Sequence, residues 1–191
     1  PVGMERAIDA EVDKINALVT VSETYSENNQ NMTVEEILAG VGEIVDMADD
    51  TGIEVEAGIG TSFYCPYEGR IPMEKTLSVV DRVVEAGVDE VTLATTMGLA
   101  NPVEIDEMYT EVFGRYPDLD VGLHLHDTNG MSLANTLTAM QCGVDRFDTS
   151  HCGLGGGVVL PEGLAGVGNT PTEDIVQMLT GMGVGTNADF E

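Results

Sequence analysis

Apolar and polar positions along the chain follow two periods in turn, one typical of helices and one typical of strands. Apolar residues at helical spacing follow start signals near residues 33, 72, 101, 132 and 170, where Thr33–Glu36 and Thr170–Glu173 have the pattern of capping boxes. Short apolar runs precede these segments or lie between them, at residues 14–20, 53–59, 90–95, 119–125 and 144–149. This alternation of strands and helices predicts an α/β fold with a parallel sheet and right-handed crossovers.

Two α/β architectures fit this order of elements, an eight-stranded barrel and a doubly wound sheet. No G-x-G-x-x-G turn follows the first strand, which weakens the dinucleotide-binding form of the doubly wound sheet. Five strands cannot close an eight-stranded barrel, so the barrel interpretation requires strands outside this chain. Under that interpretation residues 1–191 form one partial barrel domain.

The charge of the chain is strongly negative, with 34 acidic residues against 7 basic ones and a net charge of −27. Such a field disfavours nucleic acid and anionic membranes as partners, and no apolar run has the length of a transmembrane helix. The acids are scattered, and dispersed surface acid with few lysines is typical of proteins from a high-salt cytoplasm. Cys65, Cys142 and Cys152 show no CxxC spacing, which also indicates a reducing cytoplasm without a disulfide framework.

The segment His124-Leu125-His126 carries the clearest chemical signal. Side chains two residues apart on a strand leave the same face, and these two lie at the carboxyl end of a predicted strand, where α/β folds place their chemistry. Paired imidazoles at such a position indicate two ligands of one metal ion. For an isolated H-x-H pattern, two solvated histidines near a loop are the alternative.

Several further motifs occur with this histidine pair, in order along nearly the whole chain. They are Ser22-Glu23, Cys65-Pro66-Tyr67-Glu68-Gly69, His124 to Gly130, Ala134-Asn135-Thr136-Leu137, Gly153-Leu154-Gly155-Gly156 and Gly168-Asn169-x-x-Thr172-Glu173-Asp174. Together they resemble the 3-hydroxy-3-methylglutaryl-CoA lyases of the HMGL-like, or DRE-TIM, metallolyase family. That family also contains isopropylmalate, homocitrate and citramalate synthases and a hydroxy-oxovalerate aldolase.

The resemblance implies a TIM (β/α)8 barrel of which this chain supplies about strands 4 to 8. The family's Arg-Asp pair on the first strand and its glutamate on the second have no counterpart here. The implied activity is divalent-metal-dependent carbon–carbon cleavage of a 3-hydroxyacyl-CoA, such as 3-hydroxy-3-methylglutaryl-CoA to acetyl-CoA and acetoacetate. The alternatives are a Claisen-condensing synthase, a hydroxy-oxoacid aldolase, an inactive fragment or an acidic cation-binding protein. The expected partners are an acyl-CoA or a small hydroxy acid, and we expect a homo-oligomer.

By the same resemblance, His124, His126 and Asn169 would bind a divalent cation, Mg²⁺ or Mn²⁺, with Zn²⁺ also compatible. His124 would take part in proton transfer as well. Asp127 is a catalytic candidate through a hydrogen bond to a ligand histidine, and a cap of the following helix is the equal alternative. For Asn169 the alternative is a polar turn residue after Gly168.

The glycine run 153–157 predicts a loop over the site, in which the backbone of Gly155, Gly156 and Gly157 approaches the bound substrate. A plain connection between a strand and a helix is the alternative. Gly157 replaces a cysteine that the lyases carry directly after Gly-Leu-Gly-Gly.

Two further positions near the predicted site bear on its chemistry. Thr95 stands where the family has an active-site aspartate, which with Gly157 leaves the exact substrate open. Cys152, next to His151, is a catalytic candidate as a replacement acid, and the alternative is a small buried residue at the strand end. Cys65 is expected to be structural.

Overall fold

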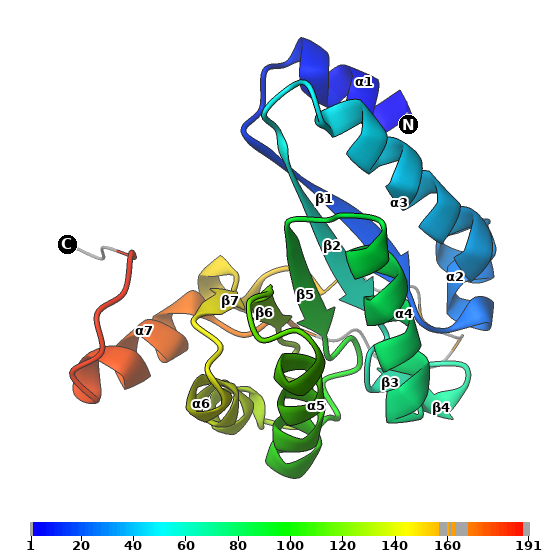
Figure 1. Cartoon of the computed structure of the whole chain (residues 1–191). Coiled ribbons are helices and arrows are strands. Elements are labelled where there is room, and N and C mark those ends of the chain that lie inside the picture. Colours follow the sequence, from blue (N-terminus) through cyan, green and yellow to red (C-terminus); the bar gives the residue numbers. More distant parts are fainter. Residues whose placement is uncertain (1, 157–159, 161, 163–167, 189–191) are drawn as a thin grey trace.

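A five-stranded parallel sheet with the order β1-β2-β5-β6-β7 forms the centre of the computed structural model (Figure 1), which describes residues 2–156, 160, 162 and 168–188. Its strands are β1 (Lys14–Thr20), β2 (Glu54–Gly60), β5 (Glu90–Ala94), β6 (Asp120–His124) and β7 (Arg146–Asp148). A small antiparallel hairpin, β3 (Tyr64–Cys65) with β4 (Gly69–Arg70), follows β2. The five parallel strands were all predicted from the sequence.

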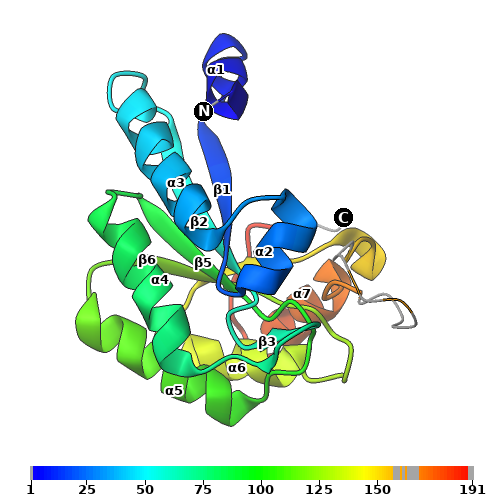
Figure 2. The same ribbon diagram turned by 90° about the vertical axis from the view of Figure 1, so that its right-hand side faces the viewer.

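Helices alternate with the strands of the sheet, and the first helix precedes β1. They are α1 (Val2–Asp9), α2 (Glu23–Gln30), α3 (Val34–Ala48), α4 (Met73–Glu85), α5 (Pro102–Arg115), α6 (Ser132–Cys142) and α7 (Thr172–Gly181), with a 3₁₀ turn η1 (His151–Gly153) after β7. Figure 2 shows α3, α4, α5 and α6 side by side along one face of the curved sheet. The hydrophobic core lies between that face and these helices, and includes Val19, Ile59, Leu77, Leu93, Ile105 and Leu123.

The two capping boxes predicted from the sequence have different outcomes in the structure. Thr33 and Glu36 form the predicted capping box of α3. The capping box predicted at Thr170–Glu173 is wrong: Pro171 is the N-cap of α7 and no side chain caps it. Thr170 is fully buried instead, and its hydroxyl donates to the carbonyl of Leu125 at 3.1 Å, which ties the start of α7 to the end of β6.

The other face of the sheet, which α3 to α6 do not cover, carries ionic side chains near the start of the strands. Arg146 on β7 contacts Glu90 at 2.7 Å and Glu56 at 3.1 Å, and Lys14 on β1 contacts Glu56 at 3.2 Å. Glu56 is only 6% exposed, and burial of a charge requires such partners. This ionic cluster links β1, β2, β5 and β7 below the site described next.

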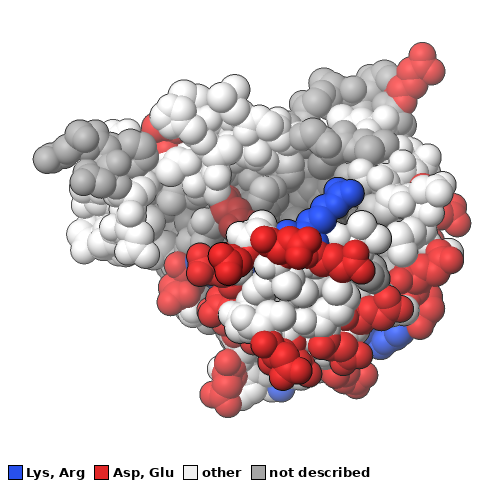
Figure 3. Space-filling model, turned by 90° about the horizontal axis from the view of Figure 1, so that it is seen from above, with Lys and Arg blue, Asp and Glu red and all other residues white. Residues whose placement is uncertain are grey.

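Acidic side chains are spread over much of the face seen in Figure 3, with few basic ones among them. This agrees with the scattered acids of the sequence. Among the described residues, no helix is both long and apolar enough to cross a membrane.

Candidate metal centre

A cavity of about 410 Å³ lies at the carboxyl ends of the parallel strands. All five strands contribute to its lining, which includes Asn16, Gly58, Thr92, His124 and Asp148. Parallel strands end at one edge of the sheet, so side chains from distant parts of the sequence converge there. The cavity therefore gathers side chains and backbone from all five parallel strands.

His124 and His126 both line this cavity, as the strand alternation predicted. His124 is the last residue of β6, and the Nε2 atoms of the two rings lie 3.3 Å apart. Two metal–nitrogen bonds of about 2.0–2.1 Å at a tetrahedral angle would place their nitrogens about 3.4 Å apart. The pair therefore has a spacing at which both imidazoles can ligate one ion.

The environment of His126 keeps its imidazole neutral. The side chain is buried, and burial together with the nearby His124 lowers its pKa from 6.5 to about 4. Its backbone amide donates to the hydroxyl of Thr95 at 3.0 Å, which fixes the chain where the ring enters the cavity. A neutral imidazole is the form that binds metals, so His126 needs no deprotonation at neutral pH.

Asp148, at the end of β7, supports His124 from the side opposite to His126. The strand register pairs the two residues, and the carboxylate Oδ2 lies 3.5 Å from the His124 Nδ1. The hydrogen bond to His124 holds the pKa of Asp148 below its usual value. Metal-ligating histidines commonly donate their second ring nitrogen to a carboxylate, and His124 has this arrangement.

Asn169 lies beside the histidine pair, because its backbone forms an isolated bridge with that of His126. Its Nδ2 donates to the carbonyl of Leu154 at 2.9 Å. Its Oδ1 is buried without a hydrogen-bond partner among the described residues. A buried carbonyl oxygen without a partner is costly, so this atom fits the role of an oxygen ligand. The predicted donor set of two imidazoles and one amide oxygen is thus assembled in one cavity.

The glycine-rich segment contacts this donor set. Gly155 has φ +101°, and a Cβ at this residue would come within 2.8 Å of the Asn169 Nδ2. Gly156 lines the cavity, whereas Gly157 lies outside the described residues. The absence of a side chain at Gly155 therefore allows the backbone to approach Asn169, and the predicted contact of this run with substrate stays a prediction.

Asp127 and Cys152 are placed differently from the histidine pair. The Asp127 carboxylate accepts from the amide of Ser132 at 2.9 Å, at the start of α6, so the helix-cap alternative is the one that the structure contains. Cys152 is exposed, so its interpretation as a small buried residue is wrong. It lies on η1 and contacts Glu173, and it is not among the described residues that line the cavity. Cys65 is buried, in agreement with a structural role.

Asp148 is the residue of this candidate site that the sequence interpretation missed. A signal existed, because Asp148 lies near the end of the predicted strand 144–149, at the sheet edge that receives His124. The pairing itself depends on the register between β6 and β7, which the sequence pattern does not give.

Comparison with known proteins agrees with this fold and site. The family model described as HMGL-like matches residues 2–191. A hydroxymethylglutaryl-CoA lyase of Bacillus subtilis is 34% identical over 189 residues, 99% of this chain and 62% of its own length. The mitochondrial hydroxymethylglutaryl-CoA lyase of Mus musculus is 33% identical over 99% of this chain and 57% of its own length. The chain therefore spans about three fifths of these relatives.

Solved structures give the same result. The HMG-CoA lyase of Bacillus subtilis superposes with a TM-score of 0.90 at 34% identity, over 98% of this chain and 62% of that one. An HMG-CoA lyase from Acinetobacter baumannii, in complex with coenzyme A and 3-methylmalate, superposes with a TM-score of 0.87 at 34% identity, over 98% and 60%. These lyases are TIM barrels, and the five parallel strands of this chain match part of such a barrel, as predicted. The chain belongs to the HMGL-like family.

Proposed function

We propose that this chain carries the cation-binding part of a carbon–carbon lyase site that cleaves a 3-hydroxyacyl-CoA, with 3-hydroxy-3-methylglutaryl-CoA as the first candidate substrate. The observation that supports this most is the facing pair His124 and His126, with Asp148 behind one ring, in the cavity at the strand ends. Identity of 34% to a hydroxymethylglutaryl-CoA lyase over nearly the whole chain supports the choice of reaction.

His124, His126 and the Asn169 amide oxygen would hold a divalent cation. Two nitrogen ligands and one oxygen ligand suit Mn²⁺ or Zn²⁺ and also admit Mg²⁺ with additional oxygen ligands. When bound, such a cation polarises the hydroxyl and carbonyl oxygens of a hydroxy-acyl substrate and stabilises the charge that develops as the carbon–carbon bond breaks.

The protein residues orient and shield this chemistry. Both ring nitrogens of His124 have assigned neighbours, Nε2 toward His126 and Nδ1 toward Asp148, so we assign His124 to ligation and not to proton transfer. Asp148 fixes the orientation of the ring and increases its basicity as a ligand. His126 is neutral and buried, so it adds a ligand without adding a charge.

The acyl-CoA part of the proposal rests on the relatives. The Acinetobacter baumannii structure contains coenzyme A and 3-methylmalate, and it matches 98% of this chain. We propose the backbone of Gly155 and Gly156 as a contact for the acyl group, because these residues lie beside Asn169 and at the cavity. We further propose a high-salt cytoplasm as the setting, on the basis of the net charge of −27.

The test uses protein made from the intact gene, in high salt, with Mn²⁺ and 3-hydroxy-3-methylglutaryl-CoA. We expect acetyl-CoA and acetoacetate in equal amounts, with loss of turnover on chelation or in His124→Ala. The control is Arg82→Ala, which removes an exposed ion pair with Glu35 on the helical face and should leave turnover unchanged. Metal binding without acetoacetate release would contradict the proposed substrate. Condensation of acetyl-CoA with an oxoacid would favour the synthase alternative.

A further inference from the structure

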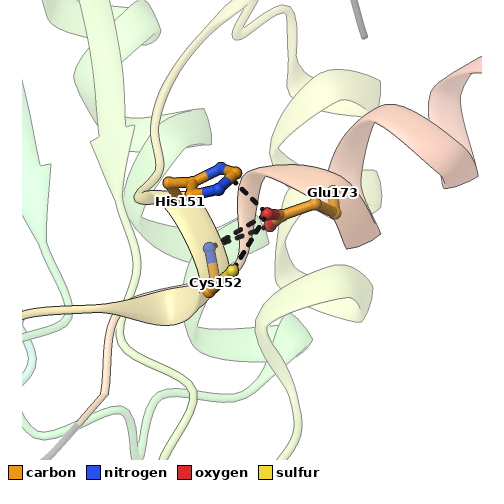
Figure 4. A group of neighbouring side chains, drawn as sticks. All are labelled: His151, Cys152 and Glu173. Atoms are coloured by element: carbon orange, nitrogen blue, oxygen red, sulfur yellow. Dashed lines mark hydrogen bonds and ion pairs between the residues drawn. The ribbon is translucent and has the colours of Figure 1, made fainter.

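Three side chains of kinds that ligate metals in other proteins meet between η1 and α7, as Figure 4 shows. None of the three is among the described residues that line the cavity. His151 and Cys152 lie on η1, and Glu173 lies in the first turn of α7. The His151 Nδ1 is 3.0 Å from the Glu173 Oε1, and the Cys152 Sγ is 3.5 Å from the same oxygen. One ligand atom from each residue lies within 4.8 Å of the other two.

The backbone holds this cluster in place. Cys152 has φ +54° and ψ +23°, in the left-handed region, which residues other than glycine rarely adopt. Its amide donates to both carboxylate oxygens of Glu173 at 3.1 Å. This conformation turns the thiol and the neighbouring imidazole toward one carboxylate, although the two side chains are adjacent in sequence. The three groups therefore come together through the folded connection between η1 and α7.

We infer that His151, Cys152 and Glu173 form a second metal site, selective for a thiophilic divalent cation of the Zn²⁺ class. Thiolate, imidazole and carboxylate are the usual zinc ligands, and bonds of about 2.0–2.3 Å would place them about 3.3–3.8 Å apart. Small rotations of exposed side chains bring the observed separations into this range. Three protein ligands leave a fourth tetrahedral position open for water or another small ligand.

Binding requires the Cys152 thiol to lose its proton to solvent. The carboxylate of Glu173 raises the pKa of this thiol, so the cysteine is protonated in the metal-free protein at neutral pH. Each bound cation then releases one proton, and affinity increases with pH. The cation replaces the thiol proton and becomes the shared partner of all three side chains.

The two sites differ in ligand chemistry, so they can be tested separately. The cavity site has imidazole and amide donors, whereas this one has a sulfur donor that favours zinc-like ions over Mg²⁺ and Mn²⁺. An occupied second site would join η1 to α7. Asn169 lies between these two elements in sequence, and a Cβ added at Gly153 of η1 would come within 3.0 Å of the Asn169 carbonyl oxygen. The expected role is to brace the segment that presents Asn169 to the cavity.

The experiment is a Co²⁺ titration of the chain followed by absorbance, because cobalt bound to a thiolate gives a near-ultraviolet charge-transfer band that oxygen and nitrogen ligands do not give. We expect the band at one equivalent in the unmodified chain and in His124→Ala, with loss of the band in Cys152→Ser and at least a tenfold lower affinity in Glu173→Gln. Cys142→Ser is the matched control and should leave the band intact, since Cys142 lies on α6, where its thiol contacts Asp106 and its side chain packs against the hydrophobic core.

Zn²⁺ should displace cobalt and release it in equal amount, and excess Mg²⁺ should not. A titration without the charge-transfer band, or a band that survives Cys152→Ser, would overturn the second site. Neither result affects the cavity site, which has no sulfur ligand. Binding of one Co²⁺ without a charge-transfer band, lost in His124→Ala and kept in Cys152→Ser, would assign the cobalt to the cavity alone and also overturn the inference.

Discussion

The buried histidine of the cavity should make the stability of the metal-free chain depend on pH in a defined way. The pKa of His126 falls from 6.5 in the unfolded chain to about 4 in the folded one. As the pH decreases below 6.5, the unfolded chain therefore takes up a proton that the folded chain does not. The free energy of unfolding should be unaffected by His126 above pH 6.5 and should decrease progressively between pH 6.5 and pH 4.

The size of the effect follows from the same two values. The pKa of His126 differs between 6.5 in the unfolded chain and about 4 in the folded chain. At about 1.4 kcal/mol for each pKa unit, this difference can lower the free energy of unfolding by about 3 kcal/mol once the pH is well below 4. Most of this, about 2 kcal/mol, should appear between pH 7 and pH 4.5. Other groups titrate in this range, so the measured quantity is the difference between the unmodified chain and His126→Gln.

The assay is urea unfolding of the metal-free protein at constant high salt, at pH 7 and at pH 4.5. Between pH 7 and pH 4.5, the free energy of unfolding of the unmodified chain should decrease by about 2 kcal/mol more than that of His126→Gln. Thr95→Val is the matched control: it removes the acceptor of the His126 amide without removing a titrating group. Its stability should be lower at both pH values by a similar amount. Equal pH dependence in the unmodified chain and in His126→Gln would refute the reasoning.

Three further substitutions separate metal binding from folding. Asp148→Asn should lower metal affinity about 10- to 100-fold with little effect on stability, which calorimetric titration can measure. Asp127→Ala should lower the free energy of unfolding in urea by about 1 kcal/mol, because the hydrogen bond from the Ser132 amide at the start of α6 is lost. Its metal affinity should be unchanged. A loss of metal affinity would instead restore the predicted catalytic role of Asp127. Gly98→Ala should lower the free energy of unfolding by more than about 1 kcal/mol, because Gly98 has φ +62° and the new Cβ would lie 2.7 Å from the His126 carbonyl oxygen. Unchanged stability in urea would contradict this.

The parts of the fold that the sequence predicted are those governed by local periodicity. Apolar runs at the five strands and the capping signal at Thr33 depend on neighbouring residues alone, and the structure contains them. The shared orientation of His124 and His126 also follows from strand alternation, and their Nε2 separation of 3.3 Å confirms it.

The parts that the sequence did not predict depend on contacts between distant segments. Asp148 reaches His124 through the register of β6 and β7. Thr170 has the pattern of a helix cap, yet its hydroxyl binds the Leu125 carbonyl, because burial against β6 removes it from the start of α7. Helix α2 is polar throughout most of its length and has no helical apolar stripe to reveal it.

Cys152 is another residue whose position depends on contacts between distant segments and was not predicted from the sequence. The predicted strand 144–149 would have placed this residue close to the sheet edge, but β7 ends at Asp148 and the chain then turns into η1. The left-handed backbone at Cys152 depends on hydrogen bonds to Glu173, which is 21 residues away. No local pattern contains that information.

The central claim, that the histidine pair binds a divalent cation, is tested most directly by Mn²⁺ titration of the chain and of His124→Ala at neutral pH. The account predicts one Mn²⁺ per chain at the cavity, loss of that binding in His124→Ala, and unchanged binding in Cys152→Ser, which alters only the second site. Equal Mn²⁺ affinity and stoichiometry in the unmodified chain and in His124→Ala would contradict the claim.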